Sequence, residues 1–407
     1  TYYYPTNDLV TGPDILFFWV ARMVIAGFEY EGKKPFNNVY LTGLIRDRNN
    51  RKMSKSLGNS PDPLDLIALY SADGVRVGIM MSSPAGGDLI FDTPLDLTKE
   101  DLESKLCEQG RNFRNKVWNA YVLVSMWNVD EAKEPTELEK IATAWMRRKV
   151  NAAAAEVADH FEKFRISEAL RTVYRVIWDD FCSWFLEMMK LGRDETMSSK
   201  SYALVVDLFE SLMQLAHPFV PFITEEIWQN LRPRKDGESI MLTQIPEPIV
   251  VGDDFDALSS FELIKETVTA IRAFRGDKGI SYKDQIDLYI NTQSPEIFTA
   301  NRPVLEKFLG TSSIQFTEKA PAGSGSLRVM TTEFYIPLLN IDVDAEKARL
   351  EKEILYNEGF LSSIEKKLGN EKFVSSAPAA VVEQERKKKA DAEATLRLLR
   401  ESLAGLG

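Results

Sequence analysis

The chain has 407 residues, of which 44% are hydrophobic and 27% are charged, and its formal net charge at pH 7 is -11. This apolar content excludes a disordered chain, a collagen-like fibre and a small disulfide-stapled protein; at roughly 100 to 200 residues per domain, the length predicts about two to four domains. The negative charge gives no overall attraction to nucleic acid or anionic lipid, so any RNA must be bound by local patches.

The chain has only two cysteines, Cys107 and Cys182, and each lies within an apolar helical pattern. We therefore expect no disulfide framework, no protein-bound structural metal and a reducing, cytoplasmic setting. The most apolar early stretch, residues 15–26, is interrupted by Arg22 and is too short to span a bilayer, so we expect neither a signal peptide nor a membrane partner. The chain opens with Thr1 in the middle of a dense pattern, which suggests a piece of a longer protein.

The first part of the chain, residues 1–95, alternates between strand and helix patterns. This alternation predicts a β-α-β unit of a parallel sheet, here only a partial, Rossmann-like half-sheet. Apolar residues occupy more than one face of the first helix, so we expect that helix to be buried on more than one side. The extended segments are residues 8–11 and 38–45, the first helix is 14–30, and another helix begins near Pro63.

Three further domains are predicted after this half-sheet. Residues 96–250 carry long apolar repeats at spacings of three and four, which predict an all-α helical bundle. Residues 251–341 combine one helix ending near Arg275 with short alternating segments, which favours a small α+β domain. Residues 342–407 hold two heptad seams separated by Gly369 and Pro378, which predict an antiparallel coiled-coil hairpin.

Residues 51–59 form the most specific stretch of the chain and read Arg-Lys-Met-Ser-Lys-Ser-Leu-Gly-Asn. Two lysines three residues apart, Lys52 and Lys55, can bring ammonium groups to a polyphosphate, while the small residues let the backbone approach closely. For an arbitrary pair of lysines at this spacing, the alternative is a solvated basic loop.

This string resembles the Lys-Met-Ser-Lys-Ser loop of class I aminoacyl-tRNA synthetases, which closes over ATP. The resemblance implies that the amino-acid carboxylate attacks the α-phosphorus while lysines stabilise the departing pyrophosphate. It implies catalytic roles for Lys52 and Lys55, with Lys55 on the phosphates and Lys52 in loop closure. ATP, with Mg²⁺ as its counter-ion, would also contact Met53 and Ser54.

An earlier turn carries a second set of candidate residues, Gly12, Asp14 and Trp19, where a strand leads into a helix and where ligands of open α/β sheets bind. Taken alone, Asp14 can be an ordinary helix N-cap and Trp19 a core aromatic. The resemblance implies instead that Gly12 and Gly43 approach the adenylate, that Asp14 accepts from ribose hydroxyls, and that Trp19 lines the amino-acid pocket.

Within this class, residues 12–23 and 41–43 look most like valyl-tRNA synthetases, and residues 369–374 resemble the C-terminal coiled-coil arm of the same enzymes. Isoleucyl enzymes often end in a cysteine-ligated zinc module that this chain cannot build. The resemblance covers essentially the whole chain and implies valine, ATP and tRNA(Val) as partners of the intact enzyme, which we expect to be a monomer. A fragment of an isoleucyl or other aliphatic class I synthetase is one alternative, and a non-catalytic RNA-binding module is another.

Part of the family's catalytic machinery is absent from the sequence. The class requires a His-x-Gly-His element, and neither of the two histidines, His160 and His217, lies in such a motif. We interpret both as structural. We therefore expect the first half of the catalytic fold and the editing domain to be missing, and this part of an ATP-dependent valine-tRNA ligase to be inactive alone.

Two basic segments are candidates for tRNA binding. The resemblance points to anticodon-loop contact by Arg111, Phe113, Asn115 and Lys116, because cations, amides and aromatics recognise unpaired bases. The alternative is an amphipathic helix with Phe113 in the core and a solvated basic face. The second segment is a basic run that is usually the solvated face of a coiled coil, but in valyl enzymes the arm lies along the tRNA, which implies phosphate contacts. Its residues are Arg386, Lys387 and Lys388.

Overall fold

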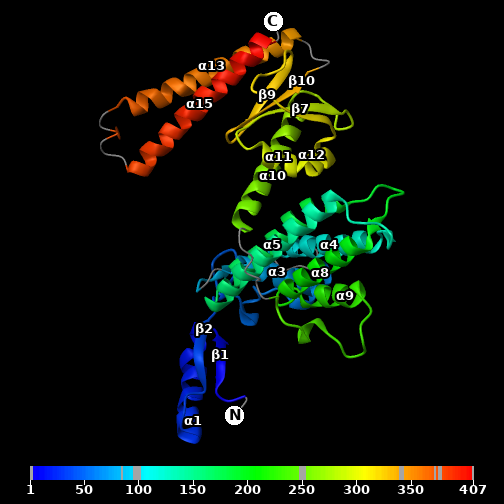
Figure 1. Cartoon of the computed structure of the whole chain (residues 1–407). Helices are drawn as coiled ribbons and strands as arrows, with labels where there is room; N and C mark the ends of the chain where they lie inside the picture. Colours follow the sequence, from blue (N-terminus) through cyan, green and yellow to red (C-terminus); the bar gives the residue numbers. More distant parts are fainter. Residues whose placement is uncertain are drawn as a thin grey trace. The chain divides into compact units, whose positions relative to one another are not determined.

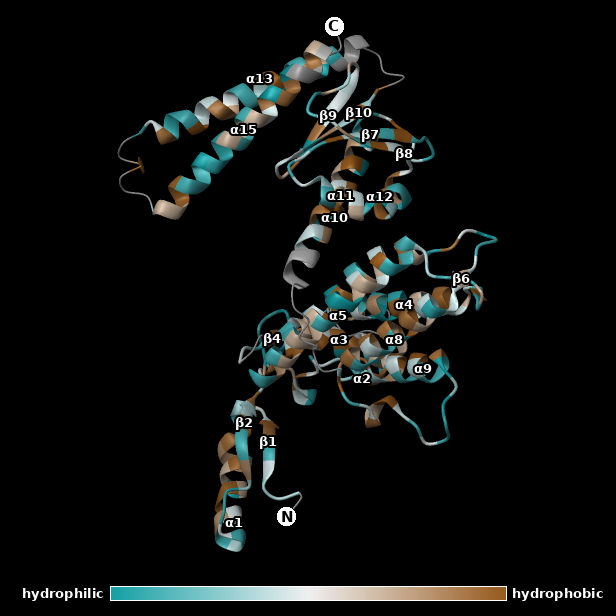
Figure 2. Cartoon of the chain, in the orientation of Figure 1, coloured by the Kyte–Doolittle hydropathy of each residue, from teal (hydrophilic) through white to brown (hydrophobic). Residues whose placement is uncertain are grey.

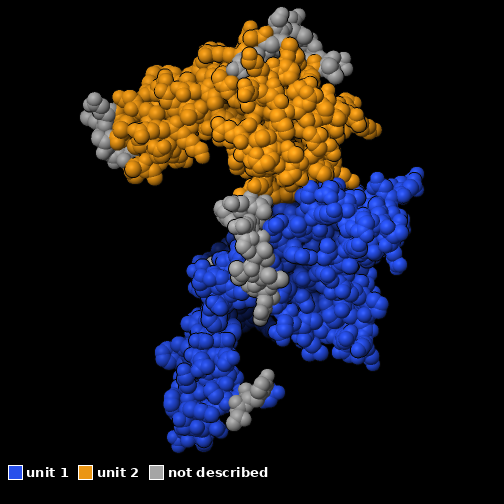
Figure 3. All heavy atoms as spheres, viewed as in Figure 1, with its two compact units in different colours: residues 1–252 blue, residues 253–407 orange. Residues whose placement is uncertain are grey.

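The computed structural model describes residues 3–83, 86–94, 102–246, 254–338, 343–370, 373–374 and 378–405. The chain forms two compact units, residues 1–252 and 253–407, shown in blue and orange in Figure 3. The domain boundaries predicted from the sequence, at 95/96, 250/251 and 341/342, lie outside the described residues. The limits of the four domains therefore stay predictions.

The chain begins with the predicted β-α-β unit (Figure 1). Strands β1 (Thr6–Thr11) and β2 (Phe36–Leu41) are parallel, with Thr6 opposite Phe36. Gly32 ends the connecting helix in the left-handed region, at φ 65°, which favours glycine. The connection consists of the 3-10 turn η1 (Pro13–Ile15), the π-helical turn η2 (Leu16–Val20) and α1 (Ala21–Glu31).

The apolar face of this connection is open to solvent, contrary to the expectation of burial on more than one side. The exposed fractions are 81% for Phe17, 70% for Phe18 and 68% for Ile25. Figure 2 colours much of this helix brown, the apolar end of the scale. The prediction was wrong for this chain because β1 pairs only with β2 among the described strands, and no second layer covers the helix.

A second small sheet and two helices follow. Strands β3 (Ile45–Arg46) and β4 (Leu89–Ile90) are parallel neighbours. Helix α2 (Pro63–Tyr70) begins where the Asp62 side chain accepts from the main-chain N–H of Leu64, with Pro63 at its first position as predicted, and α3 (Ala72–Ser82) comes next. These elements share a core cluster with the start of α4 (Lys105–Ser125): Leu66, Tyr70, Val75, Leu89, Phe91, Leu102 and Cys107.

Helix α3 also binds the helical bundle. A Cβ on Gly110 of α4 would lie 2.1 Å from the Gly74 carbonyl oxygen, so these two helices cross at backbone contact. The Asp73 carboxylate accepts from the first main-chain amides of α9 (Pro221–Leu231), at 3.3 and 2.8 Å. Arg76 donates to the Phe219 carbonyl at 3.1 Å. One helix therefore connects the loop-bearing part of the unit to the bundle.

The described part of 102–231 forms helices, as the apolar spacing predicted, which are joined by loops and by one short parallel strand pair. Its core contains Phe181, which lies with ring centroids 5.4 Å from Phe185 and 4.8 Å from Phe209. The helical elements are α4 (Lys105–Ser125), α5 (Glu137–Glu162), α6 (Ile166–Arg175), the π-helical η5 (Val176–Phe185), α7 (Leu186–Met189), α8 (Ser199–Ala216) and α9, and the strands are β5 (Val129–Asp130) and β6 (Met197–Ser198).

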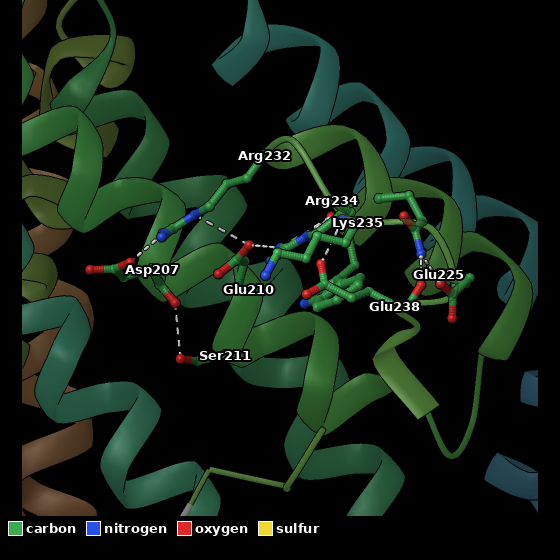
Figure 4. Close-up of polar contacts among 10 residues, drawn as sticks. Asp207, Glu210, Ser211, Glu225, Arg232, Arg234, Lys235 and Glu238 are labelled. Carbon is green, nitrogen blue, oxygen red and sulfur yellow. Dashed lines mark hydrogen bonds and ion pairs between the residues drawn. The ribbon is translucent and has the colours of Figure 1, made fainter. Parts of the chain in front are cut away.

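Polar contacts fix the segment after α9 to the bundle (Figure 4). Arg234 pairs with Glu210 and stacks its guanidinium 3.6 Å from the Trp228 ring centroid. Glu225 accepts from the Ser239 hydroxyl at 2.7 Å, just before the 3-10 turn η6 (Ile240–Leu242). These contacts explain an ordered turn in a stretch where the sequence predicted no particular element.

The second unit contains a four-stranded sheet in the order β8-β7-β10-β9. Its predicted α+β character is confirmed, although the sequence did not predict β8, β9, α11 or α12. Arg275 is 1% exposed and donates to the main-chain carbonyls of Leu309 and Asp284, at 2.5 and 2.7 Å. The elements are α10 (Asp254–Asp277), β7 (Ile286–Asn291), α11 (Pro295–Ala300), α12 (Arg302–Leu309), β8 (Thr311–Phe316), β9 (Ser324–Val329) and β10 (Thr332–Pro337).

The unit ends in the predicted helical hairpin, α13 (Val343–Leu368) and α15 (Ala379–Gly405), drawn in orange and red in Figure 1. The buried seam between the helices includes Leu350, Ile364, Val382 and Leu396. The Gly369 amide donates to the Glu365 carbonyl at 2.8 Å, which caps α13 as expected. The base of the hairpin is attached to the sheet, because Arg397 pairs with Glu333 and the Ser326 hydroxyl donates to the Leu398 carbonyl at 3.4 Å.

Candidate functional site

A buried carboxylate lies at the base of the loop that follows β3. Asp47 is 2% exposed, and its Oδ1 accepts from the main-chain amides of Asn49 and Arg51 at 3.0 and 2.9 Å. Its Oδ2 accepts from the Arg51 Nε at 2.8 Å and from the Asn59 Nδ2 at 3.0 Å. These donors, Asn59 first, lower the pKa of Asp47 to about 2.

Asn59 closes the other end of the same loop and is 5% exposed. Its Oδ1 accepts from the Ser54 amide at 2.9 Å, and its Nδ2 donates to the Lys52 carbonyl at 3.3 Å as well as to Asp47. The segment between these two residues therefore forms a closed loop whose ends are hydrogen-bonded to each other.

Inside the loop, the chain makes a tight capped turn. The Ser54 hydroxyl accepts from the Leu57 amide at 3.3 Å and caps the 3-10 turn η3 (Lys55–Leu57), and Gly58 follows at φ 64°. The Met53 side chain, by contrast, packs against the core cluster that α2, α3 and β4 share. The loop is thus held at Met53 while its serines and lysines face outward.

The two lysines of the loop have different surroundings. The Lys52 ammonium lies 2.5 Å from the Asp14 carboxylate, and this contact lowers the pKa of Asp14. The Lys55 side chain is exposed and forms no hydrogen bond or ion pair within the described part of the chain. The structure therefore brings the loop and the earlier strand-to-helix turn together, and it leaves Lys55 available to an anion.

Three other candidate residues lie near this point. A Cβ on Gly12 would lie 2.7 Å from the Asp14 carboxylate, so Gly12 leaves room for that side chain. A Cβ on Gly43 would lie 1.7 Å from the Gly87 carbonyl, so a neighbouring backbone segment already accounts for this glycine. Trp19, predicted to line an amino-acid pocket, is 55% exposed on η2.

The candidate RNA-binding residues on α4 divide into one core residue and three on the polar face. Phe113 is fully buried and stacks on Tyr174 at a centroid distance of 4.9 Å, so it cannot stack on a base and we withdraw it as a contact. The buried side of an amphipathic helix, the alternative considered from the sequence, explains it. The polar face carries Arg111, which pairs with Glu108 at 3.1 Å, Asn115, which is exposed, and Lys116, 5.4 Å from the Trp178 ring centroid.

The basic run of α15 is exposed but partly neutralised by neighbouring glutamates. Lys388 pairs with Glu385 at 2.7 Å, and Arg386 lies 3.5 Å from Glu383. Lys387 is exposed and makes no ion pair among the described residues. The three cations are therefore accessible to different degrees, with Lys387 the least engaged.

Comparison with known proteins identifies the family. Residues 1–92 match the family described as tRNA synthetases class I (I, L, M and V), residues 143–290 match the anticodon-binding domain of tRNA ligase, and residues 342–407 match the valyl tRNA synthetase tRNA binding arm. The valine--tRNA ligase of Parabacteroides distasonis is 50% identical over 406 residues, covering 100% of this chain and 45% of that protein. The chain belongs to the valyl-tRNA synthetase family.

A more distant valine--tRNA ligase agrees with this assignment. The valine--tRNA ligase of Bacillus licheniformis is 38% identical over 416 residues, covering 99% of this chain and 46% of that protein. Among solved structures, the LeuRS of Agrobacterium radiobacter K84, in a ternary complex with tRNA and LeuAMS, matches with a TM-score of 0.42 at 16% identity, covering 76% of this chain and 37% of that one. The predicted valyl family is confirmed, and the chain spans less than half the length of its curated relatives.

Sequence reasoning about this synthetase chain gave no role to Asp47 or to Asn59. Asn59 is the last residue of the specific stretch 51–59, and that position could have indicated a role in the loop. Asp47 lies in a polar turn, where an exposed carboxylate is the ordinary expectation. The two histidines, interpreted as structural from the sequence, contact bundle residues: the His217 ring lies 2.7 Å from the Thr224 hydroxyl with its pKa lowered by burial, and the His160 ring lies 3.6 Å from Glu156.

Both cysteines are buried free thiols, and burial raises the pKa of Cys182 to about 12. No group of three or more histidine, cysteine, aspartate and glutamate side chains in the described ranges is placed to hold a metal ion. Across those ranges, no helix combines the length and the apolar character that a membrane crossing requires.

The low pKa of Asp47 predicts how the loop of this synthetase chain responds to acid. A carboxyl whose pKa falls from 3.8 to about 2 on folding stabilises the loop above its unfolded-state pKa, and this contribution is lost as pH falls through about 2. We expect the Asp47 carboxyl carbon, followed by NMR, to titrate near pH 2, and Asn59→Ala to raise that midpoint. A midpoint near 4 in the unaltered chain would contradict the hydrogen bonding described here.

Proposed function

We propose that this chain is part of an ATP-dependent valine-tRNA ligase, which activates valine as valyl-adenylate and transfers it to tRNA(Val). The chain would supply the ATP loop and the tRNA-binding regions. The single observation that supports this most is the loop at 51–59, anchored at both ends with Lys55 free to meet a phosphate. Two family segments that follow the loop along the chain, residues 143–290 and 342–407, support a role in tRNA binding.

In this proposal the loop binds ATP through its charge and its small residues. Lys55 would contact the phosphates and stabilise the charge that develops on pyrophosphate, and Lys52 would hold the closed loop. Met53 and Ser54 would complete the contact with ATP, since one fixes the loop to the core and the other caps the turn that carries Lys55. Mg²⁺ would arrive bound to the phosphate oxygens, its preferred ligands.

The earlier turn would complete the adenylate site. Asp14 would accept from the ribose hydroxyls and Gly12 would give the nucleotide close access, while Trp19 would line the valine pocket. Gly43 would lie nearby. Its close approach to the main chain of residue 87 would shape the adenylate site, and Gly43 itself would not contact the nucleotide. The ion pair between Lys52 and Asp14 supports this arrangement, because it joins the loop to the turn.

The open apolar face of η2 and α1 supports a missing half of the catalytic fold. Phe17, Phe18 and Ile25 are exposed there, and curated relatives are more than twice as long as this chain. In the intact enzyme, the remainder of the catalytic sheet would cover these side chains. The chain alone would then lack half of the residues that surround the adenylate.

The proposed tRNA contacts lie on α4 and on the hairpin. Arg111, Asn115 and Lys116 would meet the anticodon loop, where amides and cations can read unpaired bases. The cations of α15 would contact phosphates, which positions the RNA without reading its sequence. These hairpin residues are Arg386, Lys387 and Lys388.

The domain organisation is part of the same proposal. Residues 1–95 would form the second half of the catalytic domain, 96–250 the anticodon-binding bundle, 251–341 the small α+β domain and 342–407 the tRNA-binding arm. A monomeric, cytoplasmic enzyme stays a prediction.

The chain alone is expected to show no valine-dependent exchange of pyrophosphate into ATP. The reason is that the His-x-Gly-His element and half of the catalytic sheet lie outside its sequence. The measurement is exchange by the purified 407-residue chain beside a full-length ligase that contains it. Valine-dependent exchange by the chain alone would disprove the assignment of the missing half.

In the full-length ligase, Lys55→Ala should slow valine activation while leaving tRNA affinity nearly unchanged. By analogy with loss of other preorganised donors, the transition state should lose ~3 kcal/mol, about a hundredfold in rate. Steady-state exchange and tRNA binding measure the two quantities separately. Lys140→Ala, which removes a surface cation paired with Glu137 at 2.7 Å on α5, is the matched control. An equal loss of tRNA binding in Lys55→Ala would mean that the loop is misassigned.

The chain is expected to bind tRNA(Val) more tightly than the same tRNA with a changed anticodon. The expectation follows from placing the anticodon contacts on α4, and it is measured by titration at fixed, stated salt. Asn115→Ala should reduce the preference, whereas Lys387→Ala should weaken both complexes alike and reduce the salt dependence. Equal, strongly salt-dependent binding of both tRNAs would leave only a backbone-binding RNA module.

A further inference from the structure

We propose that Asp47 and Asn59 form an anchor that closes the base of the ATP loop and so sets the positions of Lys52 and Lys55. Both are positioning residues, since neither is placed to touch substrate. The inference rests on the proposed function of the loop, and it adds two residues to which that function gave no role.

The anchor is built on a carboxylate whose two oxygens each accept two hydrogen bonds. Asp47 accepts four hydrogen bonds of 3.0 Å or less, two from main-chain amides and two from the side chains of Arg51 and Asn59. At 2% exposure it has little access to water, so these donors are what make its burial tolerable. Removing one of them leaves a buried charge short of a partner.

Asn59 uses both ends of its amide, and only an amide can do so. Its oxygen accepts from the Ser54 N–H, and its nitrogen donates to the Lys52 carbonyl and to Asp47. The two main-chain partners lie on either side of Met53, so one side chain holds the segment that separates the two lysines. A carboxylate at this position would lack the donor and would face Asp47 with a like charge.

Other contacts in the described part of the chain hold Lys52 more than they hold Lys55. The main chain of Lys52 forms an antiparallel bridge with Arg46 of β3, and the Met53 amide donates to the Ile45 carbonyl at 3.0 Å. Lys52 has the exposed ion pair to Asp14, and an exposed pair of this kind is worth little by itself. Lys55 lies on a single 3-10 turn that Ser54 caps, and Ser54 in turn donates its amide to Asn59. Asn59 therefore acts on the position of Lys55 through a chain of two hydrogen bonds, and Met53, held by packing and by its amide bond to Ile45, is the second attachment.

The first test measures the loop itself in this chain, without any assay of activity. Trypsin cuts after lysine and arginine, and residues 51, 52 and 55 place three such bonds inside the loop. Asn59→Ala should speed cleavage at these bonds roughly tenfold, because local opening costs less when the anchor is lost. Mass spectrometry locates the cuts, and the thermal unfolding midpoint is recorded for each variant to show that unit 1 remains folded.

Asn49→Ala is the matched control for this measurement. It makes the same substitution at the opposite end of the same loop, and the bond from residue 49 to Asp47 comes from its main-chain amide, which alanine keeps. Cleavage of this variant should match that of the unaltered chain. Equal cleavage of the Asn59→Ala and unaltered chains would overturn the anchor.

The second test uses the full-length ligase that contains these residues. Asn59→Ala should raise the KM for ATP and lower kcat in valine-dependent exchange by about tenfold or more together, while tRNA affinity stays unchanged. Asn59→Asp should be at least as impaired, and combining it with Asp47→Asn should restore part of the loss by re-forming a donor and acceptor pair. A double variant no better than Asn59→Asp alone would overturn the pairing.

The two tests separate failure of the anchor from failure of the proposed function. Faster cleavage with unchanged ATP kinetics, in an enzyme that Lys55→Ala still impairs, would overturn the positioning role. If Lys55→Ala also left exchange intact while Asn59→Ala still accelerated cleavage, the ATP role of the loop would fail and the positioning role with it. Faster cleavage together with impaired use of ATP supports the proposal.

Discussion

The contact between α3 and its two helical neighbours is the constraint on which the first unit depends. Gly74 and Gly110 bring α3 and α4 to backbone contact, and a side chain at either position would force them apart. Asp73 caps α9, although burial raises the pKa of its carboxyl, because the amides of α9 favour a negative charge there. One helix therefore supports the loop at 51–59 on one side and α4 on the other.

The loop and the bundle are stabilised by different physics. The bundle is held by apolar burial, in which Phe181 and its aromatic neighbours contribute through area and packing. The loop has few apolar contacts besides Met53, so a buried polar network has to define its shape. Such a network is directional and specifies geometry well, and a site that must position ammonium groups against phosphates needs that property.

The sequence predicted the elements that have strong periodicity, and it predicted less well what depends on distant partners. The bundle and the hairpin follow from spacing, because each buries its own apolar stripe within the chain, and the β-α-β unit follows from the alternation of strand and helix patterns. The exposure of Phe17 and Phe18 could not be predicted, since helical periodicity shows an apolar face but does not show whether another layer covers it. Phe113 illustrates the reverse, because a motif-based role in RNA binding conflicted with the ordinary amphipathic pattern, and the pattern was right.

The distribution of charge explains how a chain with a net charge of -11 can be proposed to hold RNA and ATP. Most cations of the hairpin face glutamates: Lys389 lies 3.0 Å from Glu365 and Lys388 lies 2.7 Å from Glu385. A paired cation must give up its partner before it contacts a phosphate, whereas a free one loses only water. Lys55 and Lys387 have no ion pair within the described ranges, so anion binding there is not opposed by an internal contact. In this proposal the positions of the unpaired cations, and not the net charge of the chain, determine where a polyanion would bind.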